Sequence, residues 1–233
     1  MENTYIGNEL DLFKNATNWK NYFSKKIKPY IKGDILEVGA GIGTNTKYLI
    51  HDNVNIKSIT CLEPDAILCK EMKLNHLNDK IDTKEILNGT IEDVNKQFDT
   101  IIYIDVLEHI EKSKEEIELI KKRLNTDGQL IILVPAFNFL FSEFDSKIGH
   151  FRRYDKQILK NEVNNTLKLQ KTFYLDSLGV IASLVNKYIL KKGTPSPANV
   201  NFWDKRIIPF SKFLDIISFN TFGKSLIGIY QKK

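Results

Sequence analysis

An acid followed by alternating glycines is the first feature of this chain that could do chemistry. The stretch Asp34 to Thr46, DILEVGAGIGTNT, has the pattern of a buried strand that carries Glu37, turns through Gly39, Gly41 and Gly43, and enters a helix. Glycines let a backbone turn tightly and approach a ligand closely. The third spaced glycine of the dinucleotide fingerprint G-x-G-x-x-G is absent, which argues against a pyrophosphate site. The charge of Glu37 instead favours a cationic ligand, such as an ammonium or a sulfonium group.

A second acid ends the next strand candidate, in the segment CLEPD. Glu63 follows the glycines by about 20 residues, the position at which an acid accepts hydrogen bonds from ribose hydroxyls in nucleotide-binding sheets. S-adenosylmethionine has a cationic sulfonium and a ribose but no phosphate. It therefore fits a site with one acid for a cation, another acid for a ribose and no phosphate cradle. An acid after the second strand also serves NAD, so the residues alone leave an NAD-dependent oxidoreductase open as an alternative.

Short apolar segments alternate with longer amphipathic segments through the first 136 residues. The strand candidates are Asp34 to Ala40, Ser58 to Pro64, Thr83 to Gly89, Phe98 to Asp105 and Gly128 to Ala136. The helix candidates between them are Thr44 to Ile50, Asp65 to Leu77 and Ser113 to Leu124, with NTDG expected to stop the last one. This alternation predicts βαβ units, and therefore a mostly parallel sheet that is covered on both faces.

The pattern changes after Pro135. An aromatic and polar segment leads to a helix that we expect from Asp155 to about Thr166. Two further strands are expected, at residues 167–177 and 224–233. Between them lies an insertion, residues 178–223, with two apolar helices separated by KKGTPSPANV. A helix is also expected before the first strand, where it would pack on the core as a flap or, alternatively, cover a substrate as a lid; its apolar residues are Trp19, Tyr22, Phe23, Ile27 and Tyr30.

Four segments together resemble a known family. ILEVGAGIGTNT, CLEPD, FDTIIYIDVLEHI and LNTDGQLIILVPA, in this order and spacing, are similar to the signature segments of class I S-adenosylmethionine-dependent methyltransferases. GHFRRYDKQIL resembles a bacterial subgroup that tailors glycans or other small molecules. The resemblance implies a Rossmann-like, doubly wound α/β fold with seven strands, the last one antiparallel. We expect a single domain, residues 1–233, with an N-terminal helical flap (1–32), a cofactor-binding core (34–136) and substrate-side cap segments (137–166 and 178–223).

The resemblance also implies a cofactor site for S-adenosylmethionine, with S-adenosylhomocysteine as product. Glu37 and the glycine loop would line the methionine end, Glu63 the ribose, Thr90 and Ile91 the adenine, and the segment after the fourth strand would lie under the sulfonium. The full expected set is Glu37, Gly39, Ala40, Gly41, Gly43, Thr44, Glu63, Pro64, Thr90, Ile91, Asp105, Val106 and His109. Many family members have an Asp where this chain has Asn88 or Gly89, so the acceptor of the adenine amine stays open.

Some of these residues have a structural alternative. Glu37 could be an acid at a strand end, Glu63 a turn cap before Pro64, His109 a packing residue and Glu108 a residue of the helix surface.

Methyl transfer to a hydroxyl or a protonated amine needs a general base. The candidate is His150 in IGHFRRY, because histidine exchanges protons near neutral pH. Arg152, Arg153 and Tyr154 beside it could bind a carboxylate, a phosphate or a sugar oxygen, or could clamp the cap to the sheet. The expected acceptor is an oxygen or nitrogen atom of a small molecule, such as a sugar, a glycan or a lipid-linked compound.

The insertion carries aromatic residues that would form the acceptor wall or a dimer surface. These are Phe202, Trp203, Phe210, Phe213 and Phe219. Because the segment is apolar and the chain has a net charge of +5, peripheral contact with a membrane is a further hypothesis. The sequence leaves monomer and homodimer open, and it leaves open a member that binds the cofactor without turnover.

Composition excludes several other classes. The lysines that give a pI near 8.9 are scattered, which disfavours nucleic-acid binding. Cys61 and Cys69 give neither a disulfide framework nor a metal-ligand cluster, and no metal is expected. The longest apolar stretch, Leu178 to Leu190, contains Asn186 and Lys187 and is shorter than the ~20 residues that span a bilayer. Without a signal-peptide pattern at the start, these features predict a soluble, cytoplasmic protein.

Overall fold

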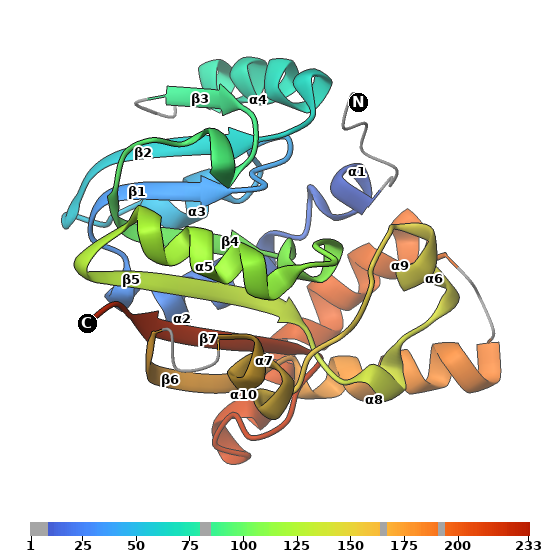
Figure 1. The fold of residues 1–233 in the computed structure, drawn as a ribbon. Helices are drawn as coiled ribbons and strands as arrows, with labels where there is room; N and C mark the ends of the chain where they lie inside the picture. The colour runs from blue at the N-terminus through green and yellow to red at the C-terminus, as the bar shows by residue number, and fades with distance from the viewer. Residues whose placement is uncertain (1–8, 80–84, 164–166, 191–193) are drawn as a thin grey trace.

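A central sheet of seven strands organises the molecule (Figure 1). The computed structural model describes residues 9–79, 85–163, 167–190 and 194–233. The strands are β1 (Gly33–Val38), β2 (Ile56–Glu63), β3 (Glu85–Asn88), β4 (Phe98–Ile104), β5 (Leu124–Pro135), β6 (Lys168–Leu175) and β7 (Ser225–Gln231).

The strand order is β3-β2-β1-β4-β5-β7-β6, and β7 runs antiparallel to both of its neighbours while the other pairs are parallel. The Rossmann-like fold with an antiparallel last strand is thereby confirmed. The chain leaves β1 between β2 and β4, where the strand order reverses. In open α/β sheets this reversal is the place where ligands bind.

Helices cover both faces of the sheet, and several lie beyond the carboxyl ends of the strands (Figure 1). The α-helices are α1 (Glu9–Phe13), α2 (Thr17–Ile27), α3 (Thr46–Ile50), α4 (Ala66–Asp79), α5 (Ser113–Arg123), α6 (Glu143–Lys147), α7 (Lys156–Val163), α8 (Ser177–Val185), α9 (Pro197–Phe202) and α10 (Ile208–Ile217). Short 3-10 helices span Lys28–Tyr30, Ile91–Asp93, Leu107–His109 and Asn138–Leu140, and π-helical turns span Asn186–Leu190 and Trp203–Ile207. Among the described residues, no helix is both long enough and apolar enough to cross a membrane.

The core has two apolar layers, one on each face of the sheet. Side chains alternate between the faces of a strand, so that Ile101 packs with Ile117 of α5 while its neighbour Ile102 belongs to the opposite cluster, with Phe23 of α2. All four of these side chains are buried. The near-continuous apolar runs of β4 and β5 are therefore explained by burial on both faces.

The segment Asn125 to Gly128 departs from the prediction. Instead of a turn that ends α5, it is the first part of β5, which begins directly after Arg123. Asp127 takes the left-handed conformation (φ 60°), and the C-terminal tail pairs with this segment through Asp127 N–H to Lys232 O (3.2 Å) and Lys232 N–H to Gly128 O (3.0 Å). Residues with turn propensity therefore form part of an irregular strand, because Lys232 near the C-terminus pairs with them.

Other element boundaries differ less. The helix expected from Thr44 begins at Thr46, and part of the expected spacer KKGTPSPANV forms α9, whose N-terminus is capped by Ser196 accepting from Asn199 N–H (3.2 Å). The expected strand start at Thr83 and the expected helix end at Thr166 lie outside the described residues.

Buried carboxylates attach the insertion to the rest of the molecule. Asp215 of α10 accepts hydrogen bonds from the hydroxyl of Tyr22 (2.8 Å) and from the backbone N–H groups of Asp176 (2.8 Å) and Ser177 (2.9 Å). Asp204 accepts from the backbone N–H of Trp19 (2.9 Å) at the start of α2. The insertion and the N-terminal helix are therefore held together over the carboxyl ends of the strands.

Candidate active site

A large cavity lies at the carboxyl ends of the central strands. Its volume is about 1270 Å³, and it is lined by the loops after β1, β2, β3 and β4, by α1, and by the two cap segments. Twelve of the residues expected from the sequence line it: Gly39, Ala40, Gly41, Thr44, Glu63, Pro64, Thr90, Ile91, Asp105, Val106, His109 and His150. Glu37 and Gly43 are expected site residues that do not line it.

The glycine loop is held to the acid of the second strand. Gly41 N–H donates to Oε2 of Glu63 (2.8 Å), and Asp65 N–H donates to Oε1 (3.0 Å). Each carboxylate oxygen has a second lone pair, so Glu63 remains able to accept from ribose hydroxyls. Gly39 has a φ of +64°, and a Cβ at this position would lie 2.5 Å from Cγ2 of Val106. The loop after β1 can therefore pack on the loop after β4 only with glycine at this position.

Glu37 lies behind the glycine loop. It is 2% exposed, and Oε2 accepts a hydrogen bond from the hydroxyl of Thr46 (2.7 Å) at the start of α3. Burial raises the pKa of Glu37 to about 7, although Thr46, Cys61 and Lys20 oppose the shift. Gly43, with φ +76°, faces α4, where a Cβ would lie 2.4 Å from Nε2 of His76. In this structure Glu37 therefore joins β1 to α3.

The N-terminal segment contributes residues that the sequence analysis missed. Glu9 and Leu10 of α1 and Lys20 of α2 line the cavity, and Leu10 lies over Gly41. Burial, followed by the nearby charge of Lys47, lowers the pKa of Lys20 to about 8. Lysines are spread through the whole sequence, so no local pattern marks Lys20 as a site residue.

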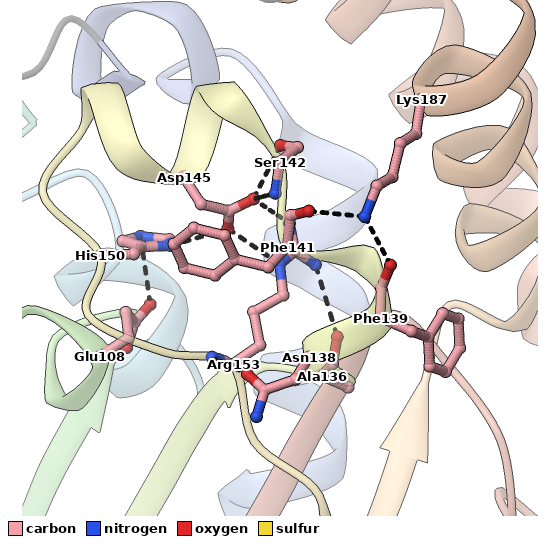
Figure 2. Close-up of polar contacts among 10 residues, drawn as sticks. All are labelled: Glu108, Ala136, Asn138, Phe139, Phe141, Ser142, Asp145, His150, Arg153 and Lys187. Atoms are coloured by element: carbon pink, nitrogen blue, oxygen red, sulfur yellow. Dashed lines mark hydrogen bonds and ion pairs between the residues drawn. The ribbon is translucent and has the colours of Figure 1, made fainter.

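His150 belongs to a polar cluster in which Asp145 bonds His150, Arg153 and Ser142 (Figure 2). Its Nδ1 is 2.9 Å from Oδ1 of Asp145, and its Nε2 is 3.7 Å from Oε1 of Glu108. Asp145 is fully buried and also accepts from Arg153 Nε (2.8 Å), Arg153 Nη2 (3.0 Å) and Ser142. Although burial would raise the pKa of Asp145, the hydrogen bond with His150 and the charge of Arg153 hold it well below its usual range. Asp145 is therefore an ionised carboxylate that fixes the orientation of His150.

The loop after β4 supplies the other half of this cluster. The ring of His109 packs edge-on against the ring of His150, with centroids 4.5 Å apart. Glu108 is fully buried, so its interpretation as helix surface is wrong. Burial raises the pKa of Asp105 to about 7, against the opposing charges of Lys224 and Arg153. Glu108 was missed as a site residue because it reaches His150 from a separate segment of the chain, whereas Asp145 lies five residues before His150 and no motif marked it.

The basic residues after His150 bind other parts of the chain. Arg152 donates to the carbonyl oxygens of Ile110 (3.0 Å) and Glu111 (2.7 Å), and Arg153 is engaged by Asp145. The buried hydroxyl of Tyr154 donates to Leu107 O (3.3 Å). These contacts tie the first cap segment to the loop after β4, and Arg153 also lines the cavity.

The aromatic residues of the insertion fall into two groups. Phe202 and Trp203 line the cavity, with Ala182 and Val185 of α8. Phe210 and Phe213 of α10, and Phe219 after it, are exposed and lie outside the cavity lining. Lys187 joins α8 to the first cap segment, because its ammonium donates to Phe139 O and Phe141 O, both at 2.7 Å (Figure 2).

Comparison with known proteins identifies the family. The family model Methyltransf_23, a methyltransferase domain, matches residues 11–181. The ubiquinone biosynthesis O-methyltransferases of two Rickettsia bellii strains, OSU 85-389 and RML369-C, are each 29% identical over 118 residues, 48% of this chain and 48% of theirs. The chain thus spans about half the length of these curated relatives.

Solved structures share the fold at low sequence identity. An S-adenosylmethionine-dependent methyltransferase from Clostridium acetobutylicum ATCC 824 matches with a TM-score of 0.60 and 12% identity, over 94% of this chain and 92% of that one. The N-methyltransferase NodS from Bradyrhizobium japonicum WM9, in complex with S-adenosylhomocysteine, matches with a TM-score of 0.60 and 12% identity, over 99% of this chain and 93% of that one.

The chain belongs to the Methyltransf_23 family of methyltransferase domains. Its fold is the one seen in solved S-adenosylmethionine-dependent methyltransferases.

Proposed function

We propose that this protein transfers the methyl group of S-adenosylmethionine to a hydroxyl oxygen of a small molecule with a large apolar part, and that His150 accepts the hydroxyl proton. The observation that supports this most directly is that one cavity contains both the glycine loop with Glu63 and the His150–Asp145 pair. The bound cofactor would supply a methyl group already activated by its sulfonium. The protein's part is to align the acceptor oxygen with that methyl and to exclude water.

The Asp145–His150 pair favours an oxygen acceptor over a neutral amine. A neutral amine can attack without losing its proton first, whereas a hydroxyl needs a proton acceptor. With Nδ1–H held by Asp145, the lone pair of His150 lies on Nε2, the nitrogen that faces Glu108. The name of the matching Rickettsia relatives, O-methyltransferases, supports the same choice.

The cavity also favours an acceptor with an apolar body. Its volume of about 1270 Å³ exceeds the ~300–1,000 Å³ of most small-molecule sites, so it has room for an acceptor beside the cofactor. Phe144, Ile148, Phe151 and Phe202 line it on the cap side. A hydroxylated ring with an alkyl or isoprenoid-like tail fits this wall better than an unmodified sugar does.

The exposed surface around α10 supports an acceptor that is taken from a membrane. Phe210, Phe213, Ile216, Ile217 and Phe219 are between 57% and 88% exposed. The exposed cations Lys205 and Arg206 lie in the turn that precedes this helix. An apolar helix face flanked by basic residues is the pattern by which helices bind anionic lipid surfaces. We therefore propose that α10 docks on an anionic membrane.

Vesicle sedimentation tests the docking surface. The protein should sediment with phosphatidylglycerol-containing vesicles and less with phosphatidylcholine vesicles, and the double variant Phe213→Ser/Phe219→Ser should stay in the supernatant. Val54→Ser, which removes an exposed apolar residue elsewhere, is the matched control. A protein that remains in the supernatant, or whose double variant instead changes from dimer to monomer in sedimentation equilibrium, contradicts membrane docking.

The enzymatic proposal is tested in two steps. Calorimetry should show binding of S-adenosylmethionine and S-adenosylhomocysteine and none of NAD. Transfer of tritiated methyl is then measured to phenols and catechols with and without an alkyl tail, to amines and to sugars. Methylated oxygen in a tailed phenol is the expected product. Products methylated only on nitrogen, or no transfer to any acceptor despite cofactor binding, would contradict the proposal.

A further inference from the structure

We infer that Glu108, His109 and His150 form a binding site for a divalent transition-metal cation such as Zn²⁺ or Mn²⁺. This inference deepens the proposed function, on which it rests, because these residues line the same cavity as the methyl-transfer site.

The three residues already offer one ligand atom each to a common point. One carboxylate oxygen and one nitrogen from each imidazole lie within 4.8 Å of one another. Ligand atoms that surround a single ion at about 2.0–2.2 Å lie roughly 3–4 Å apart. A small adjustment of the side chains would therefore close the group around a cation.

Glu108 lacks the partners that a buried carboxylate normally has. It is 0% exposed, and neither of its carboxylate oxygens accepts a hydrogen bond. Within the described part of the chain, Glu108 is paired with His150, whose Nε2 lies 3.7 Å from Oε1, beyond hydrogen-bond distance. Arg153, whose charge acts on Glu108, donates instead to Asp145 and to Ala136 O. Burying a carboxylate without hydrogen bonds is costly, so an oxygen in this position is typical of one that binds an ion.

Asp145 provides the support that metal-binding histidines usually have. Its Oδ1 holds Nδ1 of His150 at 2.9 Å, which leaves the lone pair of Nε2 toward Glu108. A carboxylate that holds a histidine in this way is the common outer partner of a metal ligand. Asp145 is itself fixed by two bonds from Arg153 and by Ser142, so the imidazole has one orientation.

The ligand set indicates which ions fit. Two imidazoles and one carboxylate suit Zn²⁺, Mn²⁺, Fe²⁺ or Co²⁺ better than Mg²⁺ or Ca²⁺, which prefer oxygen ligands alone.

Three protein ligands leave open positions for other groups, as in catalytic metal sites. The acceptor hydroxyl would occupy one of them. There its O–H bond would break and the proton would go to solvent, and the oxygen would keep the electron pair that forms the bond to the methyl carbon as the methyl carbon–sulfur bond breaks and its electrons go to the sulfur. In that state His150 would serve as a ligand and the cation would replace it as the activating group.

Direct metal binding tests the inference without cofactor or acceptor. The full chain is stripped with a chelator and then titrated with Zn²⁺ by calorimetry and with Co²⁺ by visible absorption. One equivalent should bind, with a cobalt spectrum that indicates mixed nitrogen and oxygen ligands. Glu108→Gln should weaken binding by at least the 10–100-fold typical of outer-partner losses, and Asp145→Asn by about 10-fold.

A surface histidine provides the control for adventitious binding. His51→Ala removes an exposed histidine that pairs with Asp52, and it should leave the stoichiometry and the cobalt spectrum unchanged. Circular dichroism establishes that each variant is folded, and His109→Asn serves as a second ligand variant if Glu108→Gln does not fold. Absence of stoichiometric binding, or loss of binding in His51→Ala with retention in Glu108→Gln, would overturn the inference.

The metal inference and the proposed function can fail separately. If the protein binds the cation through Glu108 but methylates no hydroxyl, the metal site is supported and the proposed function is contradicted. Methyl transfer that continues in a chelator-treated protein without bound metal supports His150 as the proton acceptor and removes the metal site.

Discussion

The backbone N–H of Gly41 donates a hydrogen bond of 2.8 Å to Oε2 of Glu63, which joins the loop after β1 to the end of β2. The two motifs that the sequence analysis treated as separate contacts to one cofactor are thus a single unit. The shape of the glycine loop therefore depends on the charge and position of Glu63.

Glu63→Gln should therefore weaken S-adenosylmethionine binding. A hydrogen bond to a charged group contributes about 1.5–3 kcal/mol, so we expect a dissociation constant roughly 10–100-fold higher. Calorimetry measures it, with the exposed Glu115→Gln as the control. An unchanged affinity would leave Glu63 only its role as a turn cap.

Gly39→Ala should destabilise the protein. The residue has φ +64°, and its Cβ would meet Val106 at 2.5 Å, so strain and overpacking together should cost roughly 2–4 kcal/mol. Urea unfolding measures the loss. The double variant Gly39→Ala/Val106→Ala should recover part of it, because it removes the clash and leaves the backbone strain. Equal stability of the two variants would show that Val106 is not the obstacle.

Lys20 should bind the carboxylate of the cofactor. Lys20→Met should raise the dissociation constant of S-adenosylmethionine about 10-fold and leave that of adenosine, which has no carboxylate, unchanged. Because burial lowers the pKa of Lys20 to about 8, its charge is present below that pH and is lost above it. Wild-type affinity should thus fall as the pH rises through 8.

The α-amino group of the cofactor titrates in the same pH range as Lys20, so the variant supplies the control. The part of the pH dependence that belongs to Lys20 should be absent in Lys20→Met. An identical pH profile in both proteins would exclude this role.

His150→Ala should abolish turnover while cofactor affinity is retained. Removing a general base typically costs about 100-fold or more in rate. Turnover is measured with the acceptor found in the methyl-transfer screen, and affinity by calorimetry. Turnover at the wild-type rate with that acceptor would remove His150 from the mechanism.

The fold was predictable where local pattern and burial agree. The apolar runs of β1, β2 and β4, bounded by Gly, Pro or Asp, predicted these strands to within two residues of their observed ends. The start of β5 was not predictable, because Asn125 to Gly128 has turn chemistry and becomes a strand only through pairing with Lys232.

The candidate site also has residues that a local motif predicts and residues that only the folded structure reveals. Gly39 and Glu63 could be predicted because each stands at a fixed place in a local motif. Lys20 could not, because its place in the site depends on how separate segments pack, and Asp145 could not, because no motif marks it although it lies only five residues before His150. Glu108 is the clearest case: a glutamate in a short 3-10 helix suggests an exposed residue, and only the fold shows that it is fully buried.

Asp204 connects the two walls of the cavity. Its carboxylate holds the start of α2, which carries Lys20, and its own turn carries Trp203 of the acceptor wall. An opening movement of either wall must therefore displace the other. We therefore expect cofactor exchange and product release to be mechanically linked through Asp204.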